Sequence, residues 1–143
     1  MVLDPLSALS LAGNIVQFVE FSSRLFGQII SLARSSNGLT EEHKEIFFHA
    51  DRLNADAISF VEIADNAGPD QDKVKVLAAM CKQLATELMD TVNDLRAEPF
   101  GGKLAIFRQA LRGLQRGPKL QELMTRVGRL RDLLNAHLLM VLK

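Results

Sequence analysis

The side chains best suited to metal, acid–base or nucleophilic chemistry are three histidines and one cysteine. His43 and His49 lie six residues apart on an expected helix, whereas a metal pair on one helix face needs a spacing of three or four. His137 and Cys81 fall in the apolar seams of two other expected helices, so we interpret them as core or boundary residues. A position in a seam shields the thiol instead of activating it.

Two further patterns are weak indicators of a catalytic or nucleotide site. Glu41, Glu42 and Glu45 fall in the first turn of an expected helix, where the helix dipole favours acids without any functional role. The segment 100–103 (FGGK) lacks the glycine spacing, the following Ser or Thr and the preceding strand of a phosphate loop. The single cysteine excludes an internal disulfide and a multi-cysteine metal site. We therefore expect no catalytic residues, no cofactor, no metal and no small-molecule substrate, and interpret the chain as a non-enzyme.

Length and composition predict an all-α protein. The chain has 143 residues, 48% hydrophobic residues and no Trp or Tyr, and it is rich in helix formers such as Leu, Ala, Lys, Arg and Glu. Capping and breaking residues divide it into expected helices over about residues 4–34, 40–67, 70–98, 103–115 and 118–143. We predict a single domain, 1–143, that forms a helical bundle of four long helices plus one short helix.

Three of the long helices carry an apolar seam that steps by three and four residues, the spacing typical of helices that pack in a bundle. The predicted seams are Ile46, Ala50, Leu53, Ala57, Phe60 and Ala64; Val74, Leu77, Cys81, Leu84, Leu88 and Leu95; and Leu120, Leu123, Val127, Leu130, Leu134, His137 and Val141.

The first helix differs because apolar residues cover most of its circumference and no charge lies between Asp4 and Glu20. Such a helix is either central to a bundle or in contact with lipid. Its uncharged stretch would be about 22 Å long as a helix, shorter than the roughly 30 Å of bilayer hydrocarbon, and Ser, Asn and Gln interrupt it. We do not expect a resting transmembrane helix.

The formal net charge of zero hides a strong asymmetry. Residues 40–69 hold seven acids and two bases (−5), and residues 99–143 hold two acids and nine bases (+7). One explanation is an acidic helix that lies beside a basic one in the bundle. The other is an acidic partner for the basic C-terminal region.

The basic residues concentrate in the stretch 103–119, where they flank an apolar helix face. This pattern is typical of a helix that binds a membrane surface or a partner, although arginines that face the acidic second helix or water would explain it equally well. Nucleic acid is not expected, because only Phe100 and Phe107 offer aromatic stacking. The candidate residues for contact with anionic lipid or a partner are Lys103, Arg108, Arg112, Arg116 and Lys119.

The stretch 4–21 (DPLSALSLAGNIVQFVEF) closely resembles the start of fungal HeLo-like domains, the N-terminal domains of fungal NOD-like (STAND) receptors and related cell-death effectors. The segments 107–112 (FRQALR) and 130–135 (LRDLLN) resemble two further parts of the same family. The resemblance thus includes both ends of the chain. The Trp that often precedes the Phe-Arg-Gln segment in the family is missing here.

The resemblance implies a four-helix-bundle domain that induces programmed cell death in fungal innate immunity and heterokaryon incompatibility. On activation by a NOD-like receptor or an amyloid-signalling partner, such domains self-associate, and the N-terminal helix leaves the bundle and permeabilises the plasma membrane. The expected localisation is cytoplasmic, with relocation to anionic lipid of the plasma membrane. The alternative is a non-enzymatic adaptor that binds another protein without a membrane step. The membrane-inserting residues implied here are Leu6, Leu9, Leu11, Ile15, Val16, Phe18 and Val19.

Overall fold

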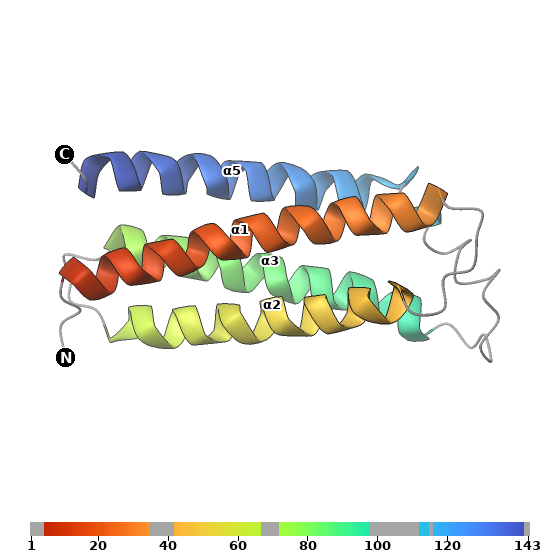
Figure 1. Ribbon diagram of the computed structural model, residues 1–143, viewed down its shortest axis with the longest axis horizontal. Coiled ribbons are helices and arrows are strands. Elements are labelled where there is room, and N and C mark those ends of the chain that lie inside the picture. Colours follow the sequence, from red (N-terminus) through yellow and green to blue (C-terminus); the bar gives the residue numbers. More distant parts are fainter. Residues whose placement is uncertain (1–4, 35–41, 67–71, 98–111, 115, 142–143) are drawn as a thin grey trace.

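The protein is an up-down-up-down helical bundle (Figure 1). The computed structural model describes residues 5–34, 42–66, 72–97, 112–114 and 116–141. Within these ranges the long helices are α1 (Pro5–Arg34), α2 (Glu42–Asp65), α3 (Asp72–Ala97) and α5 (Pro118–Val141). The all-α prediction with four long helices is confirmed. Most of the expected short helix over 103–115 lies outside the described residues, and its described part, 112–114, is helical.

Local chemistry explains where the described helices begin and end. Pro5 and Pro118 are the first residues of α1 and α5, where a missing N–H removes no helical hydrogen bond. At the end of α2, the backbone N–H and the side-chain amide of Asn66 donate to the carbonyls of Ile63 (3.2 Å) and Glu62 (3.0 Å). Before α5, Gly117 N–H donates to the carbonyl of Gly113, which would lie only 3.2 Å from a Cβ at position 117.

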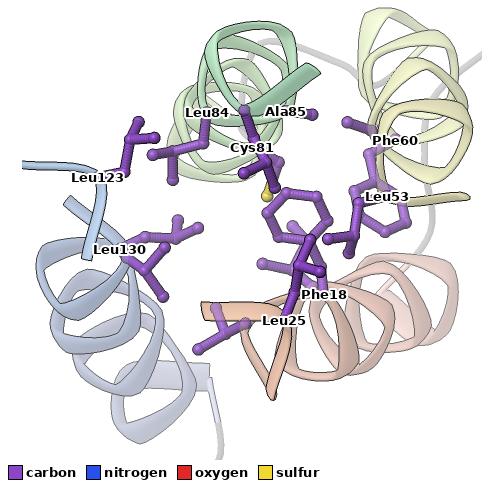
Figure 2. Packing of buried hydrophobic residues seen from close by; sticks show 14 of the residues in the cluster. Phe18, Leu25, Leu53, Phe60, Cys81, Leu84, Ala85, Leu123 and Leu130 are labelled. Carbon is purple, nitrogen blue, oxygen red and sulfur yellow. The ribbon is translucent and has the colours of Figure 1, made fainter. Parts of the chain in front are cut away.

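One apolar stripe from each long helix forms the core (Figure 2). Every predicted seam residue whose side chain is described is buried, except His137, which is half-buried at the end of α5. Leu95 and Val141 lie outside the described side chains. The rings of Phe18 and Phe60 meet edge to face across α1 and α2, with centroids 6.0 Å apart. The seam pattern in the sequence therefore predicts the core correctly.

The arrangement of the helices corrects one expectation. Helix α1 packs against the other three long helices, whereas α2 and α5 each pack against α1 and α3 and lie diagonally across from one another (Figure 2). The acidic second helix is thus not beside the described basic helix α5. In an up-down-up-down bundle the second and fourth long helices occupy opposite corners, so their charges do not meet across a shared interface.

Candidate functional site

The predicted membrane-inserting residues form two groups on α1. Four side chains face the core and are at most 3% exposed, so they are inaccessible while α1 stays in the bundle. Val16 is half-buried at the edge of this stripe. Leu9 is 37% exposed, and Leu6 lies in the first turn with its side chain outside the described part. The buried four are Leu11, Ile15, Phe18 and Val19.

The opposite face of α1 meets solvent, which corrects the expectation of a helix at the centre of the bundle. Ser10, Gly13, Asn14 and Gln17 are exposed and repeat at the three- and four-residue steps of one helix face. A four-helix bundle has no central helix, so these few small or polar residues define the outer face of α1. That face carries no charge before Glu20. In the described part of the chain, no helix has both the length and the apolarity to cross a membrane.

The predicted basic set is only partly described. Lys103 and Arg108 lie outside the described residues. Arg112 and Arg116 are exposed just before α5. The ammonium group of Lys119 is 3.1 Å from a carboxylate oxygen of Glu87 on α3. Its charge is therefore already partly neutralised.

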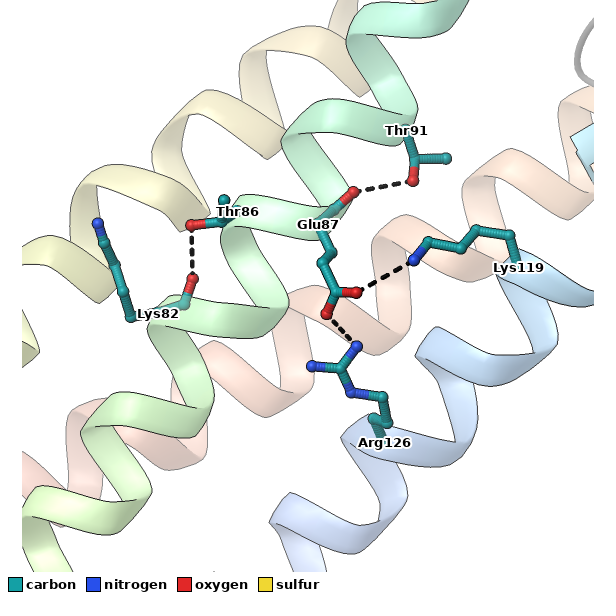
Figure 3. Close-up of polar contacts among 6 residues, drawn as sticks. All are labelled: Lys82, Thr86, Glu87, Thr91, Lys119 and Arg126. Carbon is teal, nitrogen blue, oxygen red and sulfur yellow. Dashed lines mark hydrogen bonds and ion pairs between the residues drawn. The ribbon is translucent and has the colours of Figure 1, made fainter.

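Glu87 joins α3 to α5 through two cations (Figure 3). Arg126 and Lys119 both donate to its carboxylate, one to each oxygen. The hydrogen bond from Arg126, followed by that from Lys119, lowers the pKa of Glu87. The sequence analysis missed this cluster. The signal was the seven-residue spacing of Lys119 and Arg126, which places both on one face of α5.

An apolar groove lies between the start of α3 and the end of α5. In Figure 1 these two helix ends lie at the end of the bundle where α1 begins. It has a volume of about 280 Å³, and its lining includes Val76, Leu133 and Met140, all of them exposed. At its edge, the pKa of His137 is lowered by burial and, to a smaller extent, by the nearby charge of Lys73. Nothing in the sequence pattern predicted this groove, because it uses residues beside the seams.

A second pocket, of about 160 Å³, lies between α1 and α2. Its lining includes Phe21 and Arg24 from α1 and His49, Arg52 and Leu53 from α2. The guanidinium carbons of Arg24 and Arg52 lie 5.8 Å and 5.9 Å from the centroid of the Phe21 ring. This pocket was also missed, because it depends on the register between two helices.

These features give the molecule an apolar groove, a small pocket and a helix whose apolar face is buried. Among the described residues there is no group of three or more His, Cys, Asp or Glu side chains that could hold a metal ion. No family model, curated protein or solved structure matches the chain.

Proposed function

We propose that the protein is a membrane-targeting, cell-death-inducing effector domain that acts by self-association and release of α1. The observation that carries the proposal is the charge distribution on α1. From Pro5 to Val19 the helix has no charged side chain, its inner face is apolar and buried, and its outer face is small or polar. Transfer of this segment into a bilayer would therefore desolvate no charge, which is the most expensive step for a helix that enters lipid.

Burial holds α1 in the bundle at rest. Each large apolar side chain of its inner face contributes about 1.5–3 kcal/mol to the packed state. Release therefore needs an acceptor for the same surface, and a membrane provides one. The uncharged stretch is only about 22 Å long as a helix, so several copies are needed to perturb a bilayer of about 30 Å. Self-association supplies these copies, and the exposed Arg112 and Arg116 can meet anionic lipid.

Dye release from anionic liposomes after forced oligomerisation of the protein tests this proposal. The wild type is expected to cause leakage, and Leu9→Glu to reduce it several-fold, because a charge enters the inserting segment at a position that is partly exposed in the folded bundle. Leu139→Glu is the matched control: Leu139 is 71% exposed on α5, so the same substitution should leave leakage unchanged. No leakage from the oligomerised wild type at any protein concentration would contradict the proposal.

The lipid contact is tested separately by sedimentation with anionic vesicles. Arg112→Glu combined with Arg116→Glu is expected to lower the bound fraction markedly, because each basic residue near an anionic surface contributes about 1 kcal/mol. An unchanged bound fraction would remove these residues from the proposed membrane contact.

The alternative function, a non-enzymatic adaptor, is favoured by the apolar groove between α3 and α5. Exposed Val76, Leu133 and Met140 offer a helix from another protein a surface to pack against. An adaptor should stay in the supernatant in the same sedimentation assay and cause no leakage. Retention of the oligomerised wild type in the supernatant would favour the adaptor over the membrane effector.

A further inference from the structure

We infer that the pocket lined by Phe21, Arg24, His49, Arg52 and Leu53 binds a small phosphate monoester. Two arginines from different helices converge on one aromatic ring, and neither has a carboxylate within salt-bridge distance among the described residues. Two like charges in one pocket repel one another. An anion with several acceptor oxygens relieves this repulsion and accepts hydrogen bonds from both guanidinium groups.

The nearest hydrogen-bond network leaves the arginines available and orients the imidazole. Gln28 Nε2 donates to the carboxylate of Glu45 (3.0 Å), an interaction that fixes the orientation of the amide because a carboxylate only accepts. The Oε1 atom of Gln28 then accepts from Nδ1 of His49 (3.3 Å). This network occupies Glu45 and Nδ1, and it makes Nε2 of the neutral imidazole an acceptor, so the two arginines supply the donors for the phosphate and Nε2 can accept only from a protonated oxygen of the ligand.

The size and lining of the pocket define the class of ligand. A volume of about 160 Å³ is below the roughly 300–1,000 Å³ of pockets for drug-sized ligands, so the ligand is small. Two cations favour a doubly charged group, and a phosphate monoester carries nearly two charges at pH 7. Phe21 and Leu53 add apolar surface for the organic part. Because each helix supplies one arginine, the bound anion bridges α1 and α2.

The bridge has a consequence for the effector mechanism, and this part rests on the proposed function. A ligand that binds only the packed arrangement stabilises it in proportion to ligand concentration. It therefore delays the departure of α1. The expected ligand effect is an inhibition of dye release, whereas the binding itself is independent of any membrane activity.

Calorimetric titration and thermal unfolding with phenyl phosphate, at constant ionic strength, test the site. Phenyl phosphate is expected to raise the melting temperature of the wild type, and phenol is not. Arg24→Gln and Arg52→Gln should each weaken binding at least about tenfold, since each removes charged hydrogen bonds. Both arginines are exposed, so the variants should fold, which circular dichroism checks. Arg129→Gln, which removes an exposed arginine from α5, is the matched control and should bind like the wild type.

Equal binding by the wild type and both pocket variants, or no binding by the wild type, would overturn the assignment. Vesicles with and without phosphatidic acid, which carries the same phosphate monoester on a lipid, distinguish the source of the ligand. Vesicle binding that phenyl phosphate competes away and that Arg24→Gln abolishes assigns the site to a lipid headgroup. Vesicle binding that neither change affects assigns it to a soluble ligand. Phenyl phosphate binding without any dye release would preserve the site and refute the effector mechanism.

Discussion

Two interfaces of the bundle differ in whether their cations are paired with a carboxylate. Between α3 and α5, the Glu87 carboxylate meets Lys119 and Arg126 (Figure 3). Between α1 and α2, Arg24 and Arg52 meet over Phe21, with no carboxylate of the described residues paired to either one. At the first interface each cation has a carboxylate partner, and at the second neither arginine has one among the described residues.

The comparison distinguishes charges that stabilise the fold from charges that are suited to binding a ligand. Oppositely charged partners at an interface add to the stability of the fold. Like charges in one pocket repel one another and lower that stability, and a bound counterion relieves the repulsion. Hydrogen bonds from Gln28 to Glu45 and from His49 to Gln28 also cross the α1–α2 interface, but they leave Arg24 and Arg52 without a described carboxylate, so a bound anion can strengthen this interface. An interface whose stability depends on a ligand would suit the proposed release of α1.

The largest expected effect is the loss of apolar packing between α1 and α2. Phe18→Ala should lower the free energy of unfolding by about 3–5 kcal/mol, because the ring is buried between α1 and α2 and its loss leaves a cavity. Urea denaturation measures the change. Phe48→Ala removes an exposed ring from α2 and should cost less than about 1 kcal/mol. Similar losses in the two variants would show that apolar packing does not dominate the α1 interface.

Charge reversal tests the two interfaces directly. Glu87→Lys should lower the free energy of unfolding by about 1–2 kcal/mol, because three cations would then meet between α3 and α5. Arg52→Glu should change it by less than about 0.5 kcal/mol in either direction, since relief of repulsion with Arg24 offsets the lost contact with Phe21. A large decrease in the free energy of unfolding of Arg52→Glu would contradict the inferred repulsion between Arg24 and Arg52.

The core could be predicted from the sequence because each seam is a local pattern. Steps of three and four residues identified Ile46, Leu77 and Leu130 as buried, and all three are. In α1 the abundance of apolar residues hid the outer face, so the exposure of Phe21 was not foreseen. The repeat of small and polar residues beginning at Ser10 was the available signal.

The groove, the pocket and the Glu87 cluster could not be predicted because they depend on which helices are neighbours and in what register. Glu87 and Arg126 are 39 residues apart, and no local pattern pairs them. Block charges suggested that the acidic second helix would lie beside the basic one, yet bundle topology places α2 and α5 at opposite corners. The membrane and partner roles of Arg112 and Arg116 stay predictions.

Acidification should selectively weaken the ion pairs of Glu87 with Lys119 and Arg126. The fold lowers the pKa of Glu87 from its ordinary value of 4.5, so its contribution to stability is complete above about pH 4.5 and is lost as the pH falls through the folded-state pKa. The stability difference between wild type and Glu87→Gln should therefore shrink below pH 4.5. Urea denaturation at pH 7 and at several lower values measures this difference. A difference that stays constant down to pH 3 would argue against the ion pairs.

Salt should produce the smallest effect, a few tenths of a kcal/mol. Raising NaCl from low to high concentration screens attraction at Glu87 and repulsion between Arg24 and Arg52. The cost of Glu87→Gln should therefore fall with salt, and any stabilisation by Arg52→Gln should fall as well. Thermal unfolding of the wild type and both variants at the two salt concentrations measures these trends. If salt changed the stability of both variants relative to the wild type in the same direction, the two interfaces would not differ in their charge pairing.

The reactivity of the single thiol, Cys81, can report the separation of α1 from the bundle. Cys81 is fully buried, its sulfur points into the centre of the bundle (Figure 2), and burial raises its pKa to about 12. Thiol-specific dyes should therefore ignore the closed protein at neutral pH, because only the thiolate reacts. Separation of α1 would hydrate the sulfur and return it to ordinary reactivity. The labelling rate of wild-type protein, without any engineered probe, should then report how often the bundle opens.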